Sequence, residues 1–406
     1  MSRSRSHASV RQYELPLWDE TLTGEAKGDS LVKCERLMER VVERGNLLCA
    51  LRRVKSNDGS PGIDGMTAEM LPAYLKEHWP AIKVSLLEGT YEPQPVRRVA
   101  IPKAGGGVRP LGIPTVLDRF IQQALLQVLQ AEWDGSFSDH SYGFRPGRSA
   151  HQAVVCAQTY LRSGYSWVVD MDLEKFFDRV NHDKLMSLVR GRVSDRRVLK
   201  LVNRYLKAGV MIGELPCPTE QGTPQGGPLS PLLANVLLDE LDRELERRGH
   251  RFVRYADDCN IYVRSRKAGE RVLAGVTRYL GQELKLQVNV AKSGVDRPWR
   301  RVFLGFTFTG RRPNRRRVSE EVMKRFKAEI RTRTGRTRGV TLTKVIADLR
   351  VYLLGWHGYF GFSEVKGMFK ELDSWIRRRL RCYVWKQWGR RGYGALRQRG
   401  VSRDLA

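Results

Sequence analysis

Two acidic residues stand side by side in a run of strand-forming residues, VRYADDCNIYV (residues 253–263). Two like charges about 4 Å apart repel by roughly 4 kcal/mol at an effective dielectric constant near 20. A β-hairpin that keeps Asp257 and Asp258 together against this repulsion is typical of a site that binds a cation. An acidic turn without a ligand is the alternative, because a lone pair of aspartates is common.

A second predicted strand, in WVVDMDLEKFFDRV (residues 167–180), also carries carboxylates. Asp170 and Asp172 alternate with apolar residues, so both are expected on one face of this strand. If the strand pairs with the hairpin, a third carboxylate joins Asp257 and Asp258. Three carboxylates can hold two Mg²⁺ ions about 3.5–4 Å apart. The spacing alone allows either Asp170 or Asp172 as the third ligand.

The charge of the whole chain indicates a polyanionic partner. Its 406 residues include 72 Lys+Arg and 44 Asp+Glu, which gives a formal net charge of +28. Nucleic acid is the first candidate for the partner of so basic a protein, and a surface charged for solubility alone is the alternative. The length predicts two or three domains, and the 41% of hydrophobic residues suffice for sizeable cores.

What the sequence lacks argues against several classes of protein. The six cysteines show no CxxC spacing, which argues against a zinc module and a disulfide framework and fits a reducing compartment. The first residues, MSRSRSHAS, lack the apolar core of a secretory signal. No apolar run approaches about 18 residues, so no membrane span is expected.

The excess charge is concentrated towards the C-terminus. Residues 311–406 hold 26 Lys+Arg and 8 Asp+Glu, net +18, and the first 310 residues hold the remaining 46 and 36, net +10. Apolar residues recur there at helical spacing, which predicts packed helices with a basic face rather than a solvated charge run. They are Val345, Leu349, Leu353 and Trp356, followed by Phe369, Leu372, Ile376, Leu380 and Tyr383. For the segment WIRRRLRCYVWKQW (residues 375–388), core packing and base stacking both remain open.

Two glycine-rich segments are candidates for contact with a phosphate or a nucleotide. In IPKAGGGVRP (residues 101–110), Lys103 and Arg109 flank a turn that lets two basic side chains converge on one phosphate group. A surface hairpin with incidental cations is the alternative. In PQGGPLSP (residues 224–231), Gly226 and Gly227 allow close approach of the backbone to a ligand. Ser230 then predicts the start of a helix with an apolar stripe. That stripe comprises Leu233, Leu237, Leu241 and Leu245, and Gly249 is expected to end the helix.

These blocks resemble those of a known family. YADD (255–258) is similar to the YxDD signature of reverse transcriptases, and the surrounding blocks resemble the bacterial group II intron-encoded reverse transcriptase–maturases. The blocks that occur in that family's order are SPGIDG (60–65), IPKAGGGVRPLGIPTVLDR (101–119), SYGFRPGRSAHQA (141–153), DLEKFFDRVNHD (172–183), QGTPQGGPLSPLLANVLLDELD (221–242), YADD, NVAKS (289–293) and FLGF (303–306). GWHGYF (355–360) and WIRRRLR (375–381) resemble its maturase segment, so the resemblance spans about residues 57–390.

The resemblance implies a catalytic site. Asp172, which begins the DLxxFFD pattern, joins Asp257 and Asp258 as the catalytic residues and metal ligands, and Asp170 takes a supporting role. Phe177 becomes the aromatic gate beneath the sugar, where a ring collides with a 2′-hydroxyl and favours deoxyribonucleotides. An ordinary core phenylalanine, which is the expectation for Phe176, is the alternative reading of Phe177.

Further roles in substrate binding follow from the same resemblance. Lys103 and Arg109 lie over the incoming triphosphate, and Gln225 touches the incoming nucleotide. Lys292, in NVAKS, touches the primer strand near its 3′ end, with a solvated lysine as the alternative. The cofactors implied are two Mg²⁺ ions, for which Mn²⁺ can substitute, and the substrates are deoxyribonucleoside triphosphates.

The fold expected is an α/β right-hand polymerase with fingers and palm, followed by an all-α thumb/maturase domain. Residues 1–30 are expected to form a flexible basic tail, 31–310 the fingers and palm, and 311–385 the helical thumb/maturase domain. Residues 386–406 are expected to form a short basic tail, a candidate remnant of a DNA-binding region. No Cys/His-bearing HNH endonuclease precedes Ala406, so cleavage of the second DNA strand by this chain is not expected.

The function implied is that of the RNA-directed DNA polymerase of a group II intron ribonucleoprotein. Such a protein copies RNA into DNA by two-metal nucleotidyl transfer and binds the intron RNA to promote splicing and mobility. The partners implied are group II intron RNA, an RNA template with a DNA primer, and target DNA, in the bacterial cytoplasm near the nucleoid and without a membrane. The sequence leaves monomer and dimer both open.

Three other functions compete with this one. The same polymerase can serve DNA repair or phage defence without an intron, and a catalytic-RNA sequence around the gene would exclude that. A splicing chaperone with a dead polymerase site is a second, against which three facing carboxylates argue. An RNA-dependent RNA polymerase is a third, and Phe177 argues against it.

Overall fold

The computed structural model describes residues 36–102, 108–212, 215–217, 222 and 226–402 of the chain. Two compact units are present, one formed by Met1–Gly135 and Val180–Leu232 and the other by Ser136–Arg179 and Leu233–Ala406. Each unit combines two separate parts of the chain, so the linear domain boundaries expected above stay a prediction. The tail expected at residues 1–30 lies outside the described residues.

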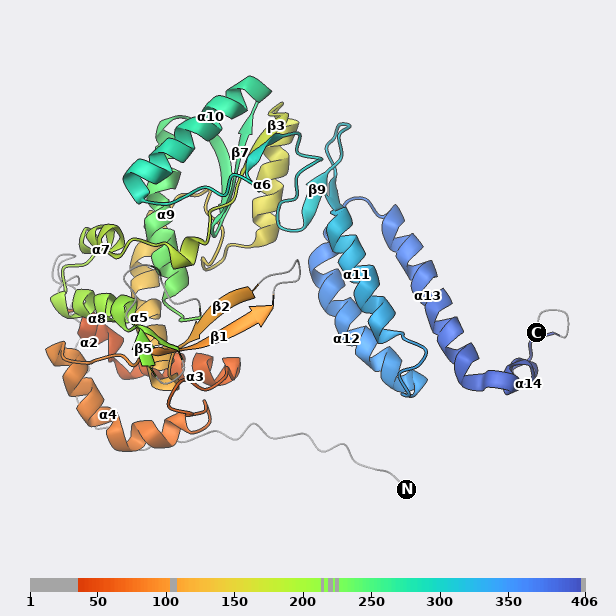
Figure 1. The fold of residues 1–406 in the computed structure, drawn as a ribbon, viewed down its shortest axis with the longest axis horizontal. Coiled ribbons are helices and arrows are strands. Elements are labelled where there is room, and N and C mark those ends of the chain that lie inside the picture. The colour runs from red at the N-terminus through yellow and green to blue at the C-terminus, as the bar shows by residue number, and fades with distance from the viewer. Residues whose placement is uncertain (1–35, 103–107, 213–214, 218–221, 223–225, 403–406) are drawn as a thin grey trace. The chain divides into compact units, whose positions relative to one another are not determined.

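The first unit combines helices with a small mixed sheet (Figure 1). Its sheet has the order β2-β1-β4-β5, in which β1 runs antiparallel to β2 and parallel to β4. The strands are β1 (Val96–Pro102), β2 (Val108–Ile113), β4 (Val210–Ile212) and β5 (Leu215–Cys217). The helices are α2 (Leu37–Val41), α3 (Arg44–Asn57), α4 (Leu71–Glu88), α5 (Val116–Trp133), α7 (His182–Arg190) and α8 (Arg196–Lys207), and the 3₁₀ turn η1 (Asp134–Ser136) follows α5.

The second unit contains the sheet that carries the predicted site. Its order is β6-β7-β3-β8, and each neighbouring pair is antiparallel. The strands are β3 (Trp167–Met171), β6 (Arg251–Tyr255), β7 (Asp258–Val263) and β8 (Gly294–Asp296). The helical elements around it are α6 (Ala150–Arg162), η2 (Phe176–Asp178), α9 (Ser230–Arg247), α10 (Arg266–Tyr279) and the π-helical turn η3 (Leu280–Leu284). α9 begins at Ser230 as predicted, and its four stripe leucines are at most 2% exposed.

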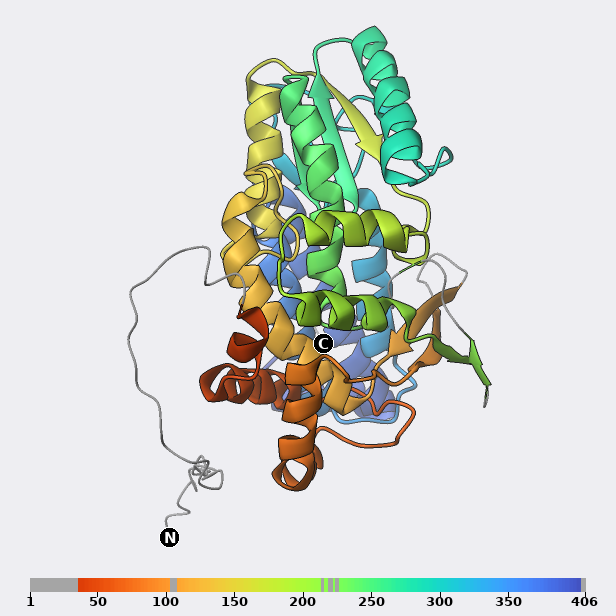
Figure 2. The same ribbon diagram turned by 90° about the vertical axis from the view of Figure 1, so that its left-hand side faces the viewer.

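Helices α6 and α10 cover opposite faces of this sheet. Val168 and Tyr262 share one face through their pairing and pack in one cluster with Val154 of α6. On the other face, Gly269 of α10 comes so close to Val295 that a Cβ would lie 2.5 Å from a methyl group. Figure 2 shows α6 and α10 on either side of the strands. Because side chains alternate along a strand, Asp170 lies on the same face as Val168, which is the α6 face.

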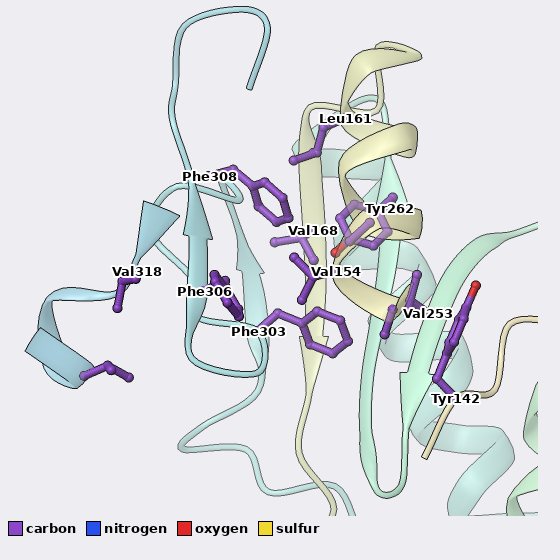
Figure 3. Packing of buried hydrophobic residues seen from close by; sticks show 13 residues of the cluster. Tyr142, Val154, Leu161, Val168, Val253, Tyr262, Phe303, Phe306, Phe308 and Val318 are labelled. Atoms are coloured by element: carbon purple, nitrogen blue, oxygen red, sulfur yellow. The ribbon is translucent and has the colours of Figure 1, made fainter. Parts of the chain in front are cut away.

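An aromatic cluster joins this sheet to a two-stranded ribbon, β9 (Phe306–Phe308) and β10 (Arg316–Val318). Phe303, Phe306 and Phe308 are each at most 4% exposed and lie beside α6 and β3 (Figure 3). Large buried aromatic side chains remove much apolar surface from water, so this cluster fixes the ribbon on the sheet.

The C-terminal part is mainly helical between Glu320 and Gln398. Its helices are α11 (Glu320–Arg333), α12 (Leu342–Phe360), α13 (Gly367–Trp388) and α14 (Gly392–Gln398), with the 3₁₀ turn η4 (Gly389–Arg391) between the last two. Val345, Leu349, Leu372 and Tyr383 are buried in one cluster, against which Leu353, Trp356, Ile376 and Leu380 pack. The expected fold class, a mixed α/β region followed by a helical region, is confirmed. Residues 316–318, expected to be helical, form β10, because they pair with β9.

Two isoleucines of the helical region test this core. Ile330 has no exposed surface, whereas Ile346 on α12 is 48% exposed. We expect Ile330→Ala to lower the free energy of unfolding by roughly 2–5 kcal/mol, because it removes buried methyl groups and leaves a cavity. Ile346→Ala should change it by less than about 0.5 kcal/mol. Denaturant titrations followed by circular dichroism measure both, and equal effects would contradict the packing described.

Candidate active site

The turn between β6 and β7 carries two of the predicted site residues. Tyr255 pairs with Asp258 across the hairpin, which leaves Ala256 and Asp257 as a two-residue turn. Ala256 has a φ of +58°, in the left-handed region that residues with a side chain rarely adopt. Both aspartates therefore lie at one end of the sheet. The backbone conformation of Ala256 beside them needs support from its neighbours.

β3 brings further carboxylates to the same end of the sheet. It pairs with β7 as the sequence predicted, with Asp170 opposite Asn260. Continued by two residues, this register brings Asp172 opposite Asp258. Asp170, Asp172 and Asp258 therefore belong to one face and one end of the sheet.

Burial and crowded negative charge shift the pKa values of these groups. Burial is the largest cause of the raised pKa of Asp258, and the negative charges of Asp170, Asp257 and Asp172 add to it. Together they raise the pKa of Asp258 to about 8. Burial also raises the pKa of Asp170 to about 6, against the opposing effect of Arg301, whose Nη1 lies 3.4 Å from its Oδ2. The raised pKa values indicate that this end of the sheet has too little positive charge. A bound cation would supply it and favour the ionised form of the carboxylates.

Asp172 is held by the loop of residues 289–293. Lys292 Nζ lies 3.0 Å from Asp172 Oδ2, and Asn289 Nδ2 donates to the same oxygen at 3.1 Å. The backbone N–H of Asp172 donates to Ser293 Oγ at 3.0 Å. The structure thus brings Lys292, predicted to contact the primer, against a predicted metal ligand.

The donor atoms at this site can be compared with those that a metal ion needs. Carboxylate oxygens are the ligands that Mg²⁺ prefers, so the residue types at the turn fit the ion. Within the part of the chain that the structure describes, no group of three or more His, Cys, Asp or Glu side chains is arranged to hold a metal. Instead, one oxygen of Asp172 is bonded to the ammonium group of Lys292.

A fully buried arginine lies directly before the turn. The side chains of Arg254 and Asp242 (on α9) have no exposed surface, and their two hydrogen bonds measure 2.6 and 2.8 Å. Arg254 Nη1 also donates to Asn235 Oδ1 at 3.0 Å and to the carbonyl oxygen of Ala256 at 2.9 Å. Its Nη2 donates to Ser141 Oγ at 2.8 Å. All three nitrogens of this buried cation are therefore hydrogen-bonded, as burial of a charge requires.

These contacts fix the backbone of the turn. Gly143 packs against Ala256 so closely that a Cβ at Gly143 would lie 2.2 Å from the Ala256 nitrogen. Asn235, which accepts from Arg254, donates through Nδ2 to the carbonyl oxygen of Gly143 at 2.9 Å. Ala256 is thus held from two sides, and the residue that follows it is Asp257.

Sequence reasoning missed Arg254 and its partners. The signal was a charged residue inside a run of strand-forming residues, where burial demands an opposite charge. Asp242 was visible in the block that ends in DELD, but nothing linked it to Arg254. Ser141 stands 113 residues before Arg254, and no local spacing predicts that contact.

Phe176 and Phe177 differ in burial as the sequence suggested. Phe176 is 3% exposed and belongs to the core, whereas Phe177 is half-buried. Their rings meet edge to face at a centroid distance of 5.1 Å. Phe177 is thus fixed by Phe176 while part of its ring stays accessible, five residues after Asp172.

Three predicted nucleotide contacts cannot be placed beside these residues. Lys103 and Gln225 lie outside the described residues. Arg109 belongs to β2, where its backbone pairs with Ile101, and its side chain is not described.

The two glycines before α9 pack closely against other residues of the protein. A Cβ on Gly226 would lie 2.6 Å from the carbonyl oxygen of Gly112, and one on Gly227 would lie 2.5 Å from Gln122 Oε1. Gly226 also has a φ of +138°, which favours glycine. Close packing within the first unit therefore accounts for both glycines.

Two regions of the chain match known protein families. Residues 101–308 match the family described as "Reverse transcriptase (RNA-dependent DNA polymerase)". Residues 323–400 match the family described as "Group II intron, maturase-specific domain". The chain therefore belongs to the reverse transcriptase family and is an RNA-directed DNA polymerase of the group II intron reverse transcriptase–maturase type.

Individual relatives differ in how much of their own length this chain covers. "Protein YkfC" of Escherichia coli strain K12 is 32% identical over 383 residues, which cover 84% of this chain and 97% of that protein. "Group II intron-encoded protein LtrA" of Lactococcus lactis subsp. cremoris is 39% identical over 195 residues, 48% of this chain and 32% of LtrA. A chain of the solved "Partial Cas6-RT-Cas1--Cas2 complex" is 24% identical, with a TM-score of 0.39, and the match covers 61% of this chain and 43% of that one.

None of the described helices is long and apolar enough to cross a membrane.

The raised pKa of Asp258 predicts a pH-dependent stability. In the unfolded chain its carboxyl ionises near pH 4, but in the folded protein near pH 8. Between these values the folded state holds a proton that the unfolded state has released, so the parent loses stability as the pH rises. Asp258→Asn removes this loss. We expect it to raise the free energy of unfolding at pH 8 by roughly 2 kcal/mol, because partial solvent access reduces the full effect.

Urea titrations in the presence of a metal chelator, at pH 5 and pH 8, measure this difference. The gain in Asp258→Asn should be smaller at pH 5. The matched control is Asp58→Asn, an exposed aspartate, which should show the same small effect at both pH values. A gain that does not grow with pH would contradict the crowding of charge described here.

Proposed function

We propose that this chain copies RNA into DNA by metal-dependent nucleotidyl transfer, with Asp172, Asp257 and Asp258 as the metal ligands. The observation that carries the proposal is the gathering of these carboxylates at one end of a sheet, where Asp258 holds its proton up to about pH 8. A chain that keeps such repelling groups on a turn fixed by a buried ion pair gains from them only when a cation binds.

The bound ions proposed are two Mg²⁺, with Mn²⁺ as a substitute. When bound, such ions would act as Lewis acids toward a primer 3′-hydroxyl and the leaving pyrophosphate. The protein's own groups prepare the site for them. Arg254 holds the turn through the carbonyl oxygen of Ala256, and Asp258 must lose its proton before it can act as a ligand.

Lys292 is proposed to contact the primer strand near its 3′ end. In the chain alone its ammonium group neutralises Asp172 at 3.0 Å, and 70% of its side chain is exposed. A flexible lysine of this kind can move to a phosphate when the carboxylate gains another cation. Lys103, Arg109 and Gln225 keep their proposed roles at the incoming nucleotide, on the strength of the family match.

The proposed partners are an RNA template with a DNA primer, group II intron RNA and target DNA. The maturase-specific match over residues 323–400 and the relation to LtrA support binding of intron RNA. The basic residues of α13 support it too, because Arg377, Arg378 and Arg381 are exposed. Arg379 differs, since its Nε donates to Thr334 Oγ1 at 2.6 Å and its guanidinium stacks on Trp375.

Primer extension on an RNA template tests the proposed site. Asp257→Asn keeps the shape of the side chain and removes its charge, so we expect the rate with Mg²⁺ to fall about a thousandfold, roughly 4 kcal/mol of transition-state stabilisation. Asp178→Asn, which alters an exposed aspartate of the DLEKFFD block, is the matched control and should retain the parental rate. A folded Asp257→Asn protein with more than about a tenth of the parental activity would rule out the assignment.

Substitution of Phe177 tests the proposed gate for the sugar. Phe177→Val removes the ring that would collide with a 2′-hydroxyl, and we therefore expect about a tenfold or larger gain in ribonucleotide relative to deoxyribonucleotide incorporation. The ratio of kcat/KM values for a matched pair of nucleotides measures this selection. Should the ratio stay the same in a folded protein, selection lies elsewhere, and Phe176→Val is the next variant to examine.

A further inference from the structure

The end of the second unit's sheet that lies opposite the carboxylates has its own chemical character. β3 begins there at Trp167, and β7 ends there at Val263. Asp172 follows Trp167 by five positions, which is about 16 Å at 3.3 Å per residue. A ligand at this end would therefore lie well away from the reacting groups.

Arginines stack on aromatic rings along this end. The guanidinium of Arg297 lies 4.1 Å from the ring centre of Trp167 and 5.5 Å from that of Trp299. It also donates to the carbonyl oxygen and the Oγ of Ser166, at 3.1 and 2.9 Å. The neighbouring Arg264 lies 5.2 Å from the ring centre of Tyr165. These contacts bring charged and aromatic groups together at this end of the sheet, in a set called the row below.

The loop between β9 and β10 extends this row. A Cβ on Gly310 would lie 3.3 Å from Trp299, so the loop packs against that indole. Arg162, the last residue of α6, donates through Nε to the carbonyl oxygen of Pro313 at 3.1 Å. Figure 3 shows Phe308, where the loop leaves β9, at the same end of the aromatic cluster as Leu161 of α6. The loop therefore belongs to this end of the sheet, with its arginines on the outside.

The charge of the row is almost entirely positive. Residues 294–317 contain eight arginines and a single acidic residue, Asp296. Ion pairs in this stretch involve Arg300, Arg301, Arg316 and Arg317. Within the described residues, the guanidinium groups of five other arginines near this end form no ion pair with a carboxylate. They are Arg264, Arg297, Arg311, Arg312 and Arg315.

We define the Trp299 patch as Tyr165, Trp167, Arg264, Arg297, Trp299, Arg311, Arg312 and Arg315, and we propose that it binds an unpaired segment of RNA. The indole of Trp299 is 38% exposed, which leaves surface on which a base can stack. The exposed Arg311, Arg312 and Arg315 offer donors for successive phosphates.

Unpaired RNA fits this surface better than a duplex does. Single-stranded RNA presents the faces of its bases, which stack on aromatic rings and guanidinium planes, whereas a duplex hides them. Stabilisation of the loops alone would explain the stacking of Arg297, but it gives no reason for three exposed arginines without acidic partners beside it. The choice of RNA rests on the proposed function, in which the chain binds a long structured RNA.

Binding of a short labelled RNA tests the patch separately from the active site. The probe is a 12-nucleotide single-stranded RNA of mixed sequence, followed by fluorescence anisotropy at several salt concentrations. A saturating unlabelled primer–template is present, so that the polymerase site is filled. The same sequence as DNA, and as a fully paired RNA duplex, provides the comparison arms. Primer extension on a short template is measured for every variant.

Substitutions of Trp299 and of two arginines separate stacking from charge. Trp299→Ala should weaken binding of the RNA about tenfold and leave the salt dependence unchanged, whereas Trp299→Phe should restore most of the affinity. Arg311→Gln with Arg312→Gln should weaken binding about fivefold and reduce the slope of log K against log salt by about 1.4, or 0.7 for each phosphate contact. The matched control is Arg271→Gln with Arg278→Gln, which removes two exposed charges from α10 and should change the affinity less than twofold.

Three outcomes would overturn the proposal. Parental affinity in a folded Trp299→Ala protein would remove the stacking site, and equal losses in the patch and control doubles would reduce it to general charge attraction. Equal losses for DNA or for duplex RNA would mean that the patch does not select unpaired RNA. Primer extension should stay at the parental rate in all these variants. A parent protein that binds the probe but extends no primer would refute the proposed polymerase function and leave the patch standing.

Discussion

The buried ion pair between Arg254 and Asp242 is the interaction on which the site depends. An arginine without exposed surface is tolerable only when its donors are all satisfied, and here Asp242, Asn235, Ser141 and the carbonyl oxygen of Ala256 satisfy them. Loss of one partner from such a pair typically destabilises a protein by about 3–5 kcal/mol. Because one of the bonds ends on the turn itself, the charge pair links helix α9 directly to the backbone that carries Asp257.

Rigid support of this kind lets the chain hold groups that repel one another. Asp258 lies among three other carboxylates, and burial with their charges raises its pKa to about 8. A flexible loop would relieve the strain by moving the side chains apart. The hairpin resists this, since Gly143 and Arg254 confine Ala256 from both sides. Stability given up at a site is a common cost of binding a cation or a transition state.

Positive charge is distributed in three different ways in this protein. Lys292 neutralises a carboxylate of the site, Arg379 is hydrogen-bonded to Thr334 in the helical region, and the arginines beside Trp299 lie over aromatic rings or reach solvent. A net charge of +28 by itself distinguishes none of these. Burial, the nearest acidic group and the nearest ring decide whether a given arginine supports the fold or remains available to a phosphate.

The sequence by itself determined much of the architecture. Strand alternation and helical spacing depend only on neighbours a few residues apart, so the strand with Asp170, the leucine stripe of α9 and the C-terminal helices were predictable. The place of Asp257 and Asp258 on a hairpin was predictable as well, because strand-forming residues flank them on both sides. Only the tertiary structure decided which groups meet across long separations. The 113 residues between Ser141 and Arg254, and the 130 between Trp167 and Arg297, carry no periodic signal, since those contacts arise from strand register and helix packing.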